Sequence, residues 1–456
     1  MREKLHIYHT NDLHSHFENW PAIVDYIGKQ RQKHTAEDEE VLLFDIGDHV
    51  DRFHPISEAT FGKANVELLN RLRYDAVTIG NNEGITLPHE ELDALYRQAE
   101  FPVIVSNLFD TSGIRPSWAE PYWIKTLKSG ITIAVLGVTV PYYPIYAQLD
   151  WKVTDAFESI ARVLKEVKGK ADITILLSHL GILDDQKAAE RFPEIDLILG
   201  SHTHHLLEDG MMKNGVLLAC AEKYGNYASH VELTFDLDRR TVSEKKASVQ
   251  KTSDWNGESE ETSAFLMKKM EQARAVLREE VAQLDHPLTA EWFQASALPQ
   301  MLADALKKWC DADIGMVNAG ILLGSLSAGP VTRGDIHRIC PHPINPVKVK
   351  LTGDELKEIV LQASAEEMEQ LHIKGLGFRG KVMGKMMYSA LDAEKLTVAG
   401  AEIEPGRTYT LATIDMFTLG TLFPAIRDAG DIEYFMPEFL RDLLAWKLEQ
   451  TCRADR

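Results

Sequence analysis

The chain has few cysteines, and their spacing suggests neither a disulfide bond nor a metal-binding pair. Its 456 residues contain four, at Cys220, Cys310, Cys340 and Cys452, and no CxxC motif occurs. Isolated cysteines of this kind are typical of free thiols in a reducing compartment. The sequence therefore favours a cytoplasmic protein with neither a disulfide framework nor a zinc ion held by cysteine.

Long apolar runs and an excess of basic charge are also missing. No segment approaches the roughly 20 apolar residues of a membrane span, and the start, MREKLHIYHTND, lacks the features of a signal peptide. Lys and Arg number 49 against 69 Asp and Glu, a net charge of −20. This balance disfavours nucleic acid as a partner, because a surface that binds it is basic. We expect no membrane partner either, and the oligomeric state stays open.

The length and the pattern of apolar residues indicate two domains. A chain of 456 residues is too long for one ordinary core. Over residues 1–240, short β-branched runs alternate with helical patterns such as 64–72 and 156–167, which predicts an α/β layer fold. Residues 241–288 are expected to form a polar linker and an amphipathic helix over 263–284. A second domain of mixed α and β structure is expected over 289–456.

Short polar clusters follow several of the apolar runs in the first domain. Each has a plain structural explanation, such as a turn, a helix cap or a satisfied core histidine. In α/β folds, however, ligands gather beyond the carboxyl ends of strands, and all the clusters fall there. Together they suit two divalent ions, with Mn, Fe, Zn or Co favoured over Ca or Mg. The candidate metal ligands are Asp12, His14, Asp48, Asn81, His179, His202 and His204.

These motifs resemble a known family of enzymes. TNDLHSH, DIGD, GNNE, SHLG and GSHTH, in this order, are similar to those of the calcineurin-like metallophosphoesterases. More narrowly, the chain resembles the two-domain bacterial 5′-nucleotidase/2′,3′-cyclic phosphodiesterase family over roughly residues 4–235. The resemblance implies an N-terminal α/β sandwich followed by a 5′-nucleotidase-type α+β domain.

The resemblance also implies a ligand set and a mechanism. One ion would be held by Asp12, His14, Asp48 and His204. The other would be held by Asp48, Asn81, His179 and His202, so that Asp48 bridges the two. The implied reaction is in-line hydrolysis, with a metal-bound hydroxide as the nucleophile on phosphorus.

One stretch departs from the family pattern. The family reads GNHEFD or GNHDFD, whereas this chain reads GNNEGI, so Asn82 takes the place of the catalytic histidine and Ile85 that of its aspartate. Asparagine cannot protonate an alkoxide leaving group, and general acid catalysis contributes roughly 10²–10⁴-fold. Two routes stay open. A nearby histidine could substitute, or the leaving group could need no acid, as in a phosphoanhydride. The nearby histidines are His16, His49 and His54.

The second domain resembles its counterpart less closely. Asn318 and Gly320 lie in NAGIL, which is similar to the family's NGGGIR, and Asn345 ends PHPIN, which is similar to PFxN. These three are the candidate substrate-binding residues. The arginine of NGGGIR is replaced by Leu322, and Arg379 is an alternative phosphate contact.

These observations lead to two functional hypotheses. The first is a dinuclear-metal-dependent phosphohydrolase with Asn82 at the catalytic position, acting on a small-molecule phosphate ester or anhydride such as a nucleotide. The alternative is a catalytically weak regulatory protein that binds metal and nucleotide. Turnover with metals present would separate them.

Overall fold

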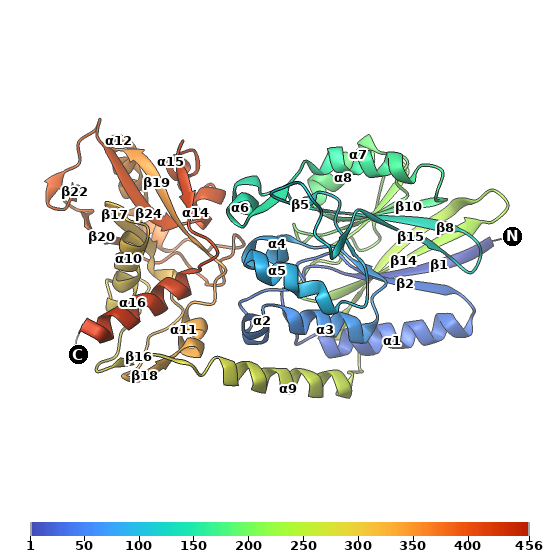
Figure 1. The fold of residues 1–456 in the computed structure, drawn as a ribbon, viewed down its shortest axis with the longest axis horizontal. Helices are drawn as coiled ribbons and strands as arrows, with labels where there is room; N and C mark the ends of the chain where they lie inside the picture. Colours follow the sequence, from blue (N-terminus) through green and yellow to red (C-terminus); the bar gives the residue numbers. More distant parts are fainter. Residues whose placement is uncertain (1, 455–456) are drawn as a thin grey trace. The chain divides into compact units, whose positions relative to one another are not determined.

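The computed structural model of the protein describes residues 2–454, with side chains as far as residue 451. The chain divides into two compact units, Met1–Gln272 and Ala273–Arg456 (Figure 1). The described part contains no helix both long and apolar enough to cross a membrane. Cys220, Cys310 and Cys340 are buried free thiols, whereas the side chain of Cys452 lies outside the described residues.

Two β-sheets form the centre of the N-terminal unit. The first runs in the order β15 (Thr241–Lys251), β14 (Tyr227–Asp236), β1 (Arg2–Thr10), β2 (Glu40–Asp45), β3 (Ala76–Val77), β4 (Val103–Ile104) and β6 (Ala119–Glu120). The second runs β12 (Met211–Lys213), β13 (Val216–Ala219), β11 (Leu197–Gly200), β10 (Ile173–His179), β8 (Thr132–Thr139) and β7 (Tyr122–Thr126). β5 (Leu108–Asp110) and β9 (Trp151–Val153) form a separate two-stranded sheet in this unit.

A continuous apolar layer forms the core shared by the two sheets. Leu5 and Ile7 of β1 belong to the same buried cluster as Val135 of β8 and Ile175 of β10. Because side chains alternate along a strand, every second residue reaches this layer. The strands β1, β2, β3 and β4 are parallel, as are β8, β10, β11 and β13. Their carboxyl ends therefore meet at one edge of each sheet.

Helices pack on the sheets of this unit. The expected helices over 64–72 and 156–167 are α3 and α7, and α7 begins at Asp155, whose side chain accepts the backbone N–H of Glu158. α7 and α8 share a buried cluster with β8 and β10. The helices are α1 (Trp20–Ala36), α2 (Pro55–Thr60), α3 (Lys63–Leu72), α4 (Asn81–Thr86), α5 (His89–Leu95), α6 (Tyr143–Gln148), α7 (Ala156–Val167), α8 (Ile182–Arg191) and α9 (Glu260–Val276).

The segment expected to form a linker and one long helix is built differently. Residues 241–251 form β15, which pairs antiparallel with β14 and closes one edge of the first sheet. An edge strand with an exposed face is polar, so its sequence looks like a loop. The helix expected over 263–284 ends at Val276, and β16 (Glu280–Leu284) follows. A short apolar run of this kind fits a helix or a strand, and antiparallel pairing with β18 makes it a strand.

The C-terminal unit is an α+β domain, as expected. Its main sheet runs β20 (Met386–Ser389), β17 (Ile314–Asn318), β24 (Thr408–Ile414), β19 (Pro346–Thr352) and β25 (Ile432–Tyr434), and only β17 and β24 pair in parallel. A small pair joins β16 to β18 (Gly329–Thr332), and β21 (Leu391–Asp392), β22 (Thr397–Val398) and β23 (Ala401–Glu402) form a third sheet. The helices are α10 (Ala297–Trp309), α11 (Arg333–Ile339), α12 (Gly353–Ala363), α13 (Glu366–Glu369), α14 (Met416–Leu419), α15 (Pro424–Arg427) and α16 (Leu440–Ala454).

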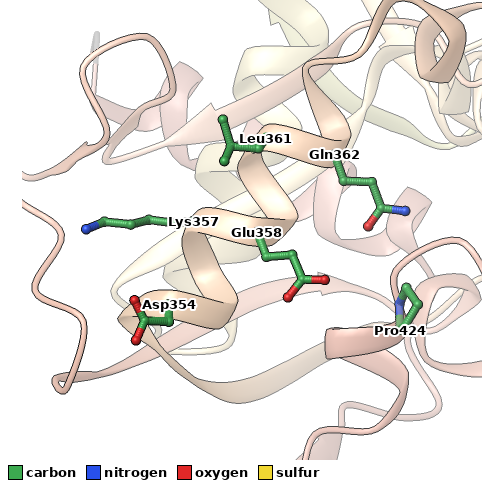
Figure 2. A pocket seen from close by; sticks show the side chains of 6 residues that line it. All are labelled: Asp354, Lys357, Glu358, Leu361, Gln362 and Pro424. Atoms are coloured by element: carbon green, nitrogen blue, oxygen red, sulfur yellow. The ribbon is translucent and has the colours of Figure 1, made fainter.

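A shallow depression of about 620 Å³ lies on the outer surface of α12 (Figure 2). Its lining mixes carboxylates, one lysine and the exposed Leu361, and contains none of the candidate site residues. The lining residues are Asp354, Lys357, Glu358, Leu361, Gln362 and Pro424.

One buried carboxyl in this unit gives its stability a pH dependence. Asp415 follows β24 and accepts the backbone N–H of Asn345 at 3.0 Å. Burial raises the pKa of Asp415 to about 7, although its backbone hydrogen bonds act in the opposite direction. The unfolded chain has the ordinary pKa of about 3.9. Between about pH 4 and pH 7 the folded state therefore keeps a proton that the unfolded state loses, so stability falls as pH rises through this window.

We predict that Asp415→Asn removes this loss. Asparagine accepts the same hydrogen bond and carries no charge, so the melting temperature of the variant should rise relative to that of the wild type between about pH 4 and about pH 8. Calorimetry of the metal-free full-length chain at both pH values measures the difference. A difference in melting temperature that does not change with pH would contradict the assignment.

Candidate metal centre

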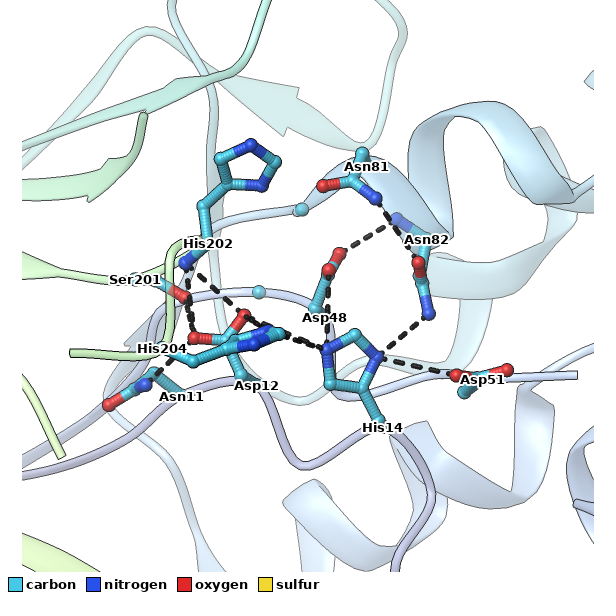
Figure 3. Close-up of polar contacts among 12 residues, drawn as sticks. Asn11, Asp12, His14, Asp48, Asp51, Asn81, Asn82, Ser201, His202 and His204 are labelled. Atoms are coloured by element: carbon cyan, nitrogen blue, oxygen red, sulfur yellow. Dashed lines mark hydrogen bonds and ion pairs between the residues drawn. The ribbon is translucent and has the colours of Figure 1, made fainter. Parts of the chain in front are cut away.

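The seven candidate ligands lie together in the N-terminal unit, at the carboxyl ends of its strands. All of them except His179 are labelled in Figure 3, and the ligand atom of His179 lies within 4.8 Å of those of Asp48 and His202. Asp12 and His14 follow β1, Asp48 follows β2, and Asn81 opens α4. His179 is the last residue of β10, and the loop after β11 carries the other two histidines. Two groups have ligand atoms that all lie within 4.8 Å of one another: Asp12, His14 and His204, and Asp48, His179 and His202.

The first group surrounds a single point. His14 Nε2 lies 3.2 Å from His204 Nε2, and Asp12 Oδ1 lies 3.9 Å and 3.6 Å from these two nitrogens. Asp48 Oδ2 is 3.7 Å from His14 Nε2. Ligands arranged tetrahedrally at 2.0–2.1 Å from a metal ion are roughly 3.3 Å apart. These four atoms already have about the spacing that one ion requires.

Asp48 connects the first group to the second. The same Oδ2 that faces His14 lies 3.4 Å from His179 Nε2, while Oδ1 accepts the backbone N–H of Asn82 at 2.7 Å. His179 holds its Nδ1 against the carbonyl of Ile46 at 2.7 Å, which directs Nε2 to the site. A single carboxylate oxygen therefore faces both groups.

Two buried atoms at the site have no hydrogen-bond partner. They are His179 Nε2 and Asn81 Oδ1. Leaving a buried polar atom unpaired is costly, and native structures rarely do so without a reason. A bound cation would satisfy both atoms. The donor set of imidazoles, carboxylates and one amide oxygen also suits divalent transition metals, so the residues fit the group that the motifs imply.

Neighbouring residues fix the direction of the candidate ligands. The Oδ2 atom of Asp12 accepts hydrogen bonds from Asn11 at 2.8 Å and Ser201 at 2.7 Å, and its Oδ1 atom is the one nearer the two histidines. His202 Nε2 lies 3.2 Å from the hydroxyl of Tyr142. Its Nδ1 is therefore the nitrogen that can offer a lone pair to a metal ion. Contacts of this kind set ring orientation and tautomer in metal sites.

Asn82, at the catalytic position, is buried and contacts a candidate ligand. Its Nδ2 lies 3.0 Å from His14 Nδ1, and Asp51 Oδ2 lies 3.4 Å from the same nitrogen (Figure 3). The outer nitrogen of His14 thus faces Asp51 and Asn82, and the inner nitrogen faces the site. With Nε2 directed to the site, Nδ1 carries the proton that faces Asp51, so Asn82 packs against the ring of His14 and offers no ionisable proton.

Glu83 is a functional residue that the sequence analysis missed. Its buried carboxylate accepts the backbone N–H groups of Asp48, Val50 and Gly80 at 2.8–2.9 Å. It therefore joins the loop after β2 to the start of α4. A glutamate three residues after a helix cap was the available signal. Tyr142 and Asp51 gave no such signal, because their contacts depend on segments far apart in sequence.

The backbone of the site is strained. Five of the seven candidate ligands have left-handed φ angles between 48° and 75°, a region that residues other than glycine rarely adopt. Such conformations cost of order 1–3 kcal/mol each and cluster at functional sites. The five are Asp12, His14, Asp48, His202 and His204.

The carboxylates of the site favour a positive charge on one histidine when no metal ion is bound. Burial disfavours a charged His179, yet the carboxylates of Asp48 and Asp12 raise its pKa to about 10. Burial lowers the pKa of His202 to about 4 and that of His204 to about 3, so both have free lone pairs at neutral pH. The two carboxylates thus favour a positive charge at His179, whereas His202 and His204 are neutral.

The three histidines considered as substitutes for the missing acid all have local partners. His16 Nδ1 contacts Glu18 at 2.7 Å, and its ring packs on Tyr224. His49 is buried beside Asn65, and burial lowers its pKa to about 3. His54 Nδ1 accepts the N–H of Ile56 at the start of α2. None of these hydrogen bonds is made to Asp48.

The candidate substrate residues of the C-terminal unit are buried. Asn318 donates its Nδ2 to the carbonyl of Met383 at 2.8 Å, while its Oδ1 is buried without a hydrogen-bond partner. Asn345 donates its Nδ2 to the carbonyl of Glu438 at 2.8 Å. At Gly320, a Cβ atom would meet the Val382 carbonyl at 1.9 Å. A substrate role for these residues stays a prediction.

Comparison with known proteins identifies the family. Residues 5–206 match the family described as calcineurin-like phosphoesterase, and residues 279–427 match the 5′-nucleotidase C-terminal domain. An uncharacterized metallophosphoesterase of Bacillus subtilis, YunD, is 63% identical over 99% of this chain and 100% of its own length. A 5′-nucleotidase of Vibrio cholerae is 24% identical over 77% of this chain and 74% of its own.

Solved structures show the same fold. A 5′-nucleotidase precursor of Thermus thermophilus covers 98% of this chain and 97% of its own, with a TM-score of 0.63 and 20% identity. The NAD nucleotidase of Haemophilus influenzae covers 99% and 97%, with a TM-score of 0.68 and 16% identity. The resemblance seen in the sequence is confirmed, and the chain belongs to the calcineurin-like metallophosphoesterases that carry a 5′-nucleotidase C-terminal domain.

Proposed function

We propose that the protein is a phosphohydrolase that uses two divalent metal ions to hydrolyse a phosphate ester or anhydride of a nucleotide or related metabolite. The observation that carries this proposal is the position of Asp48, whose Oδ2 faces both groups of candidate ligands. The unpartnered atoms His179 Nε2 and Asn81 Oδ1 support it. Mn, Zn, Co and Fe are the metals that this donor set favours.

Each proposed metal position uses four residues. Asp12 Oδ1, His14 Nε2, Asp48 Oδ2 and His204 Nε2 would hold one ion. Asp48 Oδ2, Asn81 Oδ1, His179 Nε2 and His202 Nδ1 would hold the other. When bound, the pair supplies Lewis acidity for the phosphoryl oxygens and activates water.

The residues of the chain supply positioning. Asp48 is fixed through Oδ1 by the Asn82 backbone, and Asp12 is fixed through Oδ2 by Asn11 and Ser201. A rigid arrangement of this kind is most of what phosphoryl transfer requires from a protein. Asn82 can donate a hydrogen bond but cannot deliver a proton to a leaving group. Substrates whose leaving group needs no acid, such as phosphoanhydrides, are therefore favoured over ordinary monoesters.

One observation favours the alternative of a weak regulatory protein. The side chain at the catalytic position lies against His14, and both members of the family's dyad are replaced, at Asn82 and Ile85. Such a protein would bind metal and nucleotide with little turnover.

A phosphate-release screen separates the two functions. The panel comprises nucleoside monophosphates, cyclic nucleotides, nucleotide sugars and dinucleoside polyphosphates, with protein reconstituted with manganese, cobalt or zinc. Asp48→Asn is the inactivating variant, and Asp285→Asn, at an exposed position after β16, is the matched control. Turnover of one class that disappears only in Asp48→Asn supports the enzyme. No release from any substrate, with two metals bound per chain, favours the regulatory protein.

We predict that Gly80→Ala disrupts the centre for lack of space. The Gly80 backbone has a φ of −99°, which alanine adopts freely, but the added Cβ would meet Asp48 Oδ1 at 2.0 Å and His179 Cε1 at 2.5 Å. Displacing these ligands by about 1 Å should lower turnover by about 100-fold and reduce the metal bound per chain.

The control for this variant is Gly28→Ala. Gly28 lies inside α1, and its Cβ would meet nothing within 4 Å. This change should raise stability by about 1 kcal/mol through helix propensity and leave metal content unchanged. Elemental analysis and thermal unfolding of both variants test the prediction. Full metal occupancy in folded Gly80→Ala would refute it.

We also predict that restoring the histidine alone gains little. Asn82→His provides an acid, but Ile85 provides no carboxylate to orient it, so kcat for a nucleoside monophosphate should rise far less than about 100-fold. The double variant Asn82→His/Ile85→Asp should exceed the single one. Steady-state kinetics on both variants is the measurement, and a hundredfold gain in the single variant would show that orientation is not limiting.

A further inference from the structure

A second histidine cluster lies under α1, separate from the candidate metal centre. Along β1, Leu5 and Ile7 point into the core between the sheets, so His6 and Tyr8 point to the opposite face. On β14, Val231 and Leu233 belong to the same core, which places His230 on the face of His6.

Helix α1 covers this face and adds a third imidazole. The Tyr8 hydroxyl lies 3.1 Å from His34 Nε2, and the Tyr8 ring meets that of Tyr26 edge to face. His34 stands near the end of α1, and Glu39 follows it in the loop before β2. Three separate segments thus bring histidines to one place.

The polar atoms of the cluster converge closely. His6 Nδ1 lies 2.9 Å from His230 Nε2, and His6 Nε2 lies 2.8 Å from Glu39 Oε2. The same Glu39 oxygen lies 3.1 Å from His34 Nδ1, and the rings of His6 and His34 stack at 3.6 Å. One ligand atom from each histidine lies within 4.8 Å of the others. His230 and Glu39 meet opposite nitrogens of His6, so the three imidazoles form the group that can hold an ion, and Glu39 lies on its outer side.

Charge and access also suit a cation. Burial lowers the pKa of His6, and it lowers that of His230 to about 4, so both imidazoles are neutral at pH 7. Hydrogen bonds from His34 and His6 keep the pKa of Glu39 low, although burial opposes them. The Glu39 side chain is 25% exposed and that of Glu37, 3.8 Å from His34, is 51% exposed. These carboxylates offer an ion a negatively charged way in from solvent.

The cluster can also exist without an ion. With one N–H on each ring, His230 donates to His6, His6 and His34 donate to Glu39, and Tyr8 donates to His34. Such a network satisfies every contact named above. Three imidazoles whose ligand atoms lie within 4.8 Å of one another, with a carboxylate against the outer nitrogen of one of them, are, however, an arrangement typical of sites for zinc and other divalent transition metals.

We propose that His6, His34 and His230 bind a third divalent transition-metal ion, for which zinc is the probe, and that Glu39 holds the outer nitrogen of His6; the count of three rests on the proposed function. The ion would tie α1 to β1 and β14. It would act as a structural site, since binding that requires the folded arrangement of three segments adds to folding free energy.

The test counts zinc in the full-length chain without an affinity tag. Protein is equilibrated with buffered zinc, separated from free metal and analysed for zinc per chain. We expect three ions in the wild type and one fewer in His34→Gln, with zinc binding at the third site weakened by more than the 10–100-fold typical of losing an outer-shell partner. His286→Gln, at an exposed position in the C-terminal unit, should match the wild type.

His230→Gln is the second variant, at the partly exposed side of the cluster. It should also bind one zinc ion fewer than the wild type, and zinc should raise its melting temperature less. The wild type and both variants keep the candidate metal centre, so the difference of one ion does not depend on how many ions that centre holds. Equal zinc content in the wild type and in either folded histidine variant would overturn the proposal, and the cluster would then be a hydrogen-bond network only.

Discussion

The position of the Asp48 carboxylate is the constraint on which the rest of the site depends. Oδ2 faces His14 on one side and His179 on the other, and Oδ1 is held by the backbone of Asn82. The left-handed backbone at Asp48, the lack of a side chain at Gly80 and the three N–H groups bound by Glu83 all serve this placement. The cost of the strained loop is met by the packed sheets beneath it.

The sequence predicted the layered fold and the gathering of the ligands for a physical reason. Buried parallel strands are short apolar runs, and polar residues such as Asp48 and His179 stand where those runs end, so their convergence follows from topology. The supporting contacts could not be predicted in this way. Tyr142 reaches His202 from a helix 60 residues earlier in the chain. Segment 280–284 has a pattern that fits a helix or a strand, and its pairing with β18 decided the outcome.

Histidine has contrasting roles in this chain. His179 is polarised by two carboxylates and directs an unpartnered nitrogen to the site, whereas His49 and His54 complete local hydrogen bonds. Sequence alone does not distinguish these roles, since each histidine follows an apolar run or a turn. What separates them is the charge around the ring and the partner of each nitrogen. His6 differs from both, because each of its nitrogens has a partner and two further imidazoles lie around it.

The most direct test of the account is anomalous diffraction from crystals grown with manganese. The account predicts two peaks about 3.5–4 Å apart, both within coordination distance of Asp48 Oδ2. His179 and Asn81 should contact one ion, and His14 and His204 the other. A single ion, or two ions that Asp48 does not bridge, would contradict the central claim that one carboxylate organises a dinuclear site.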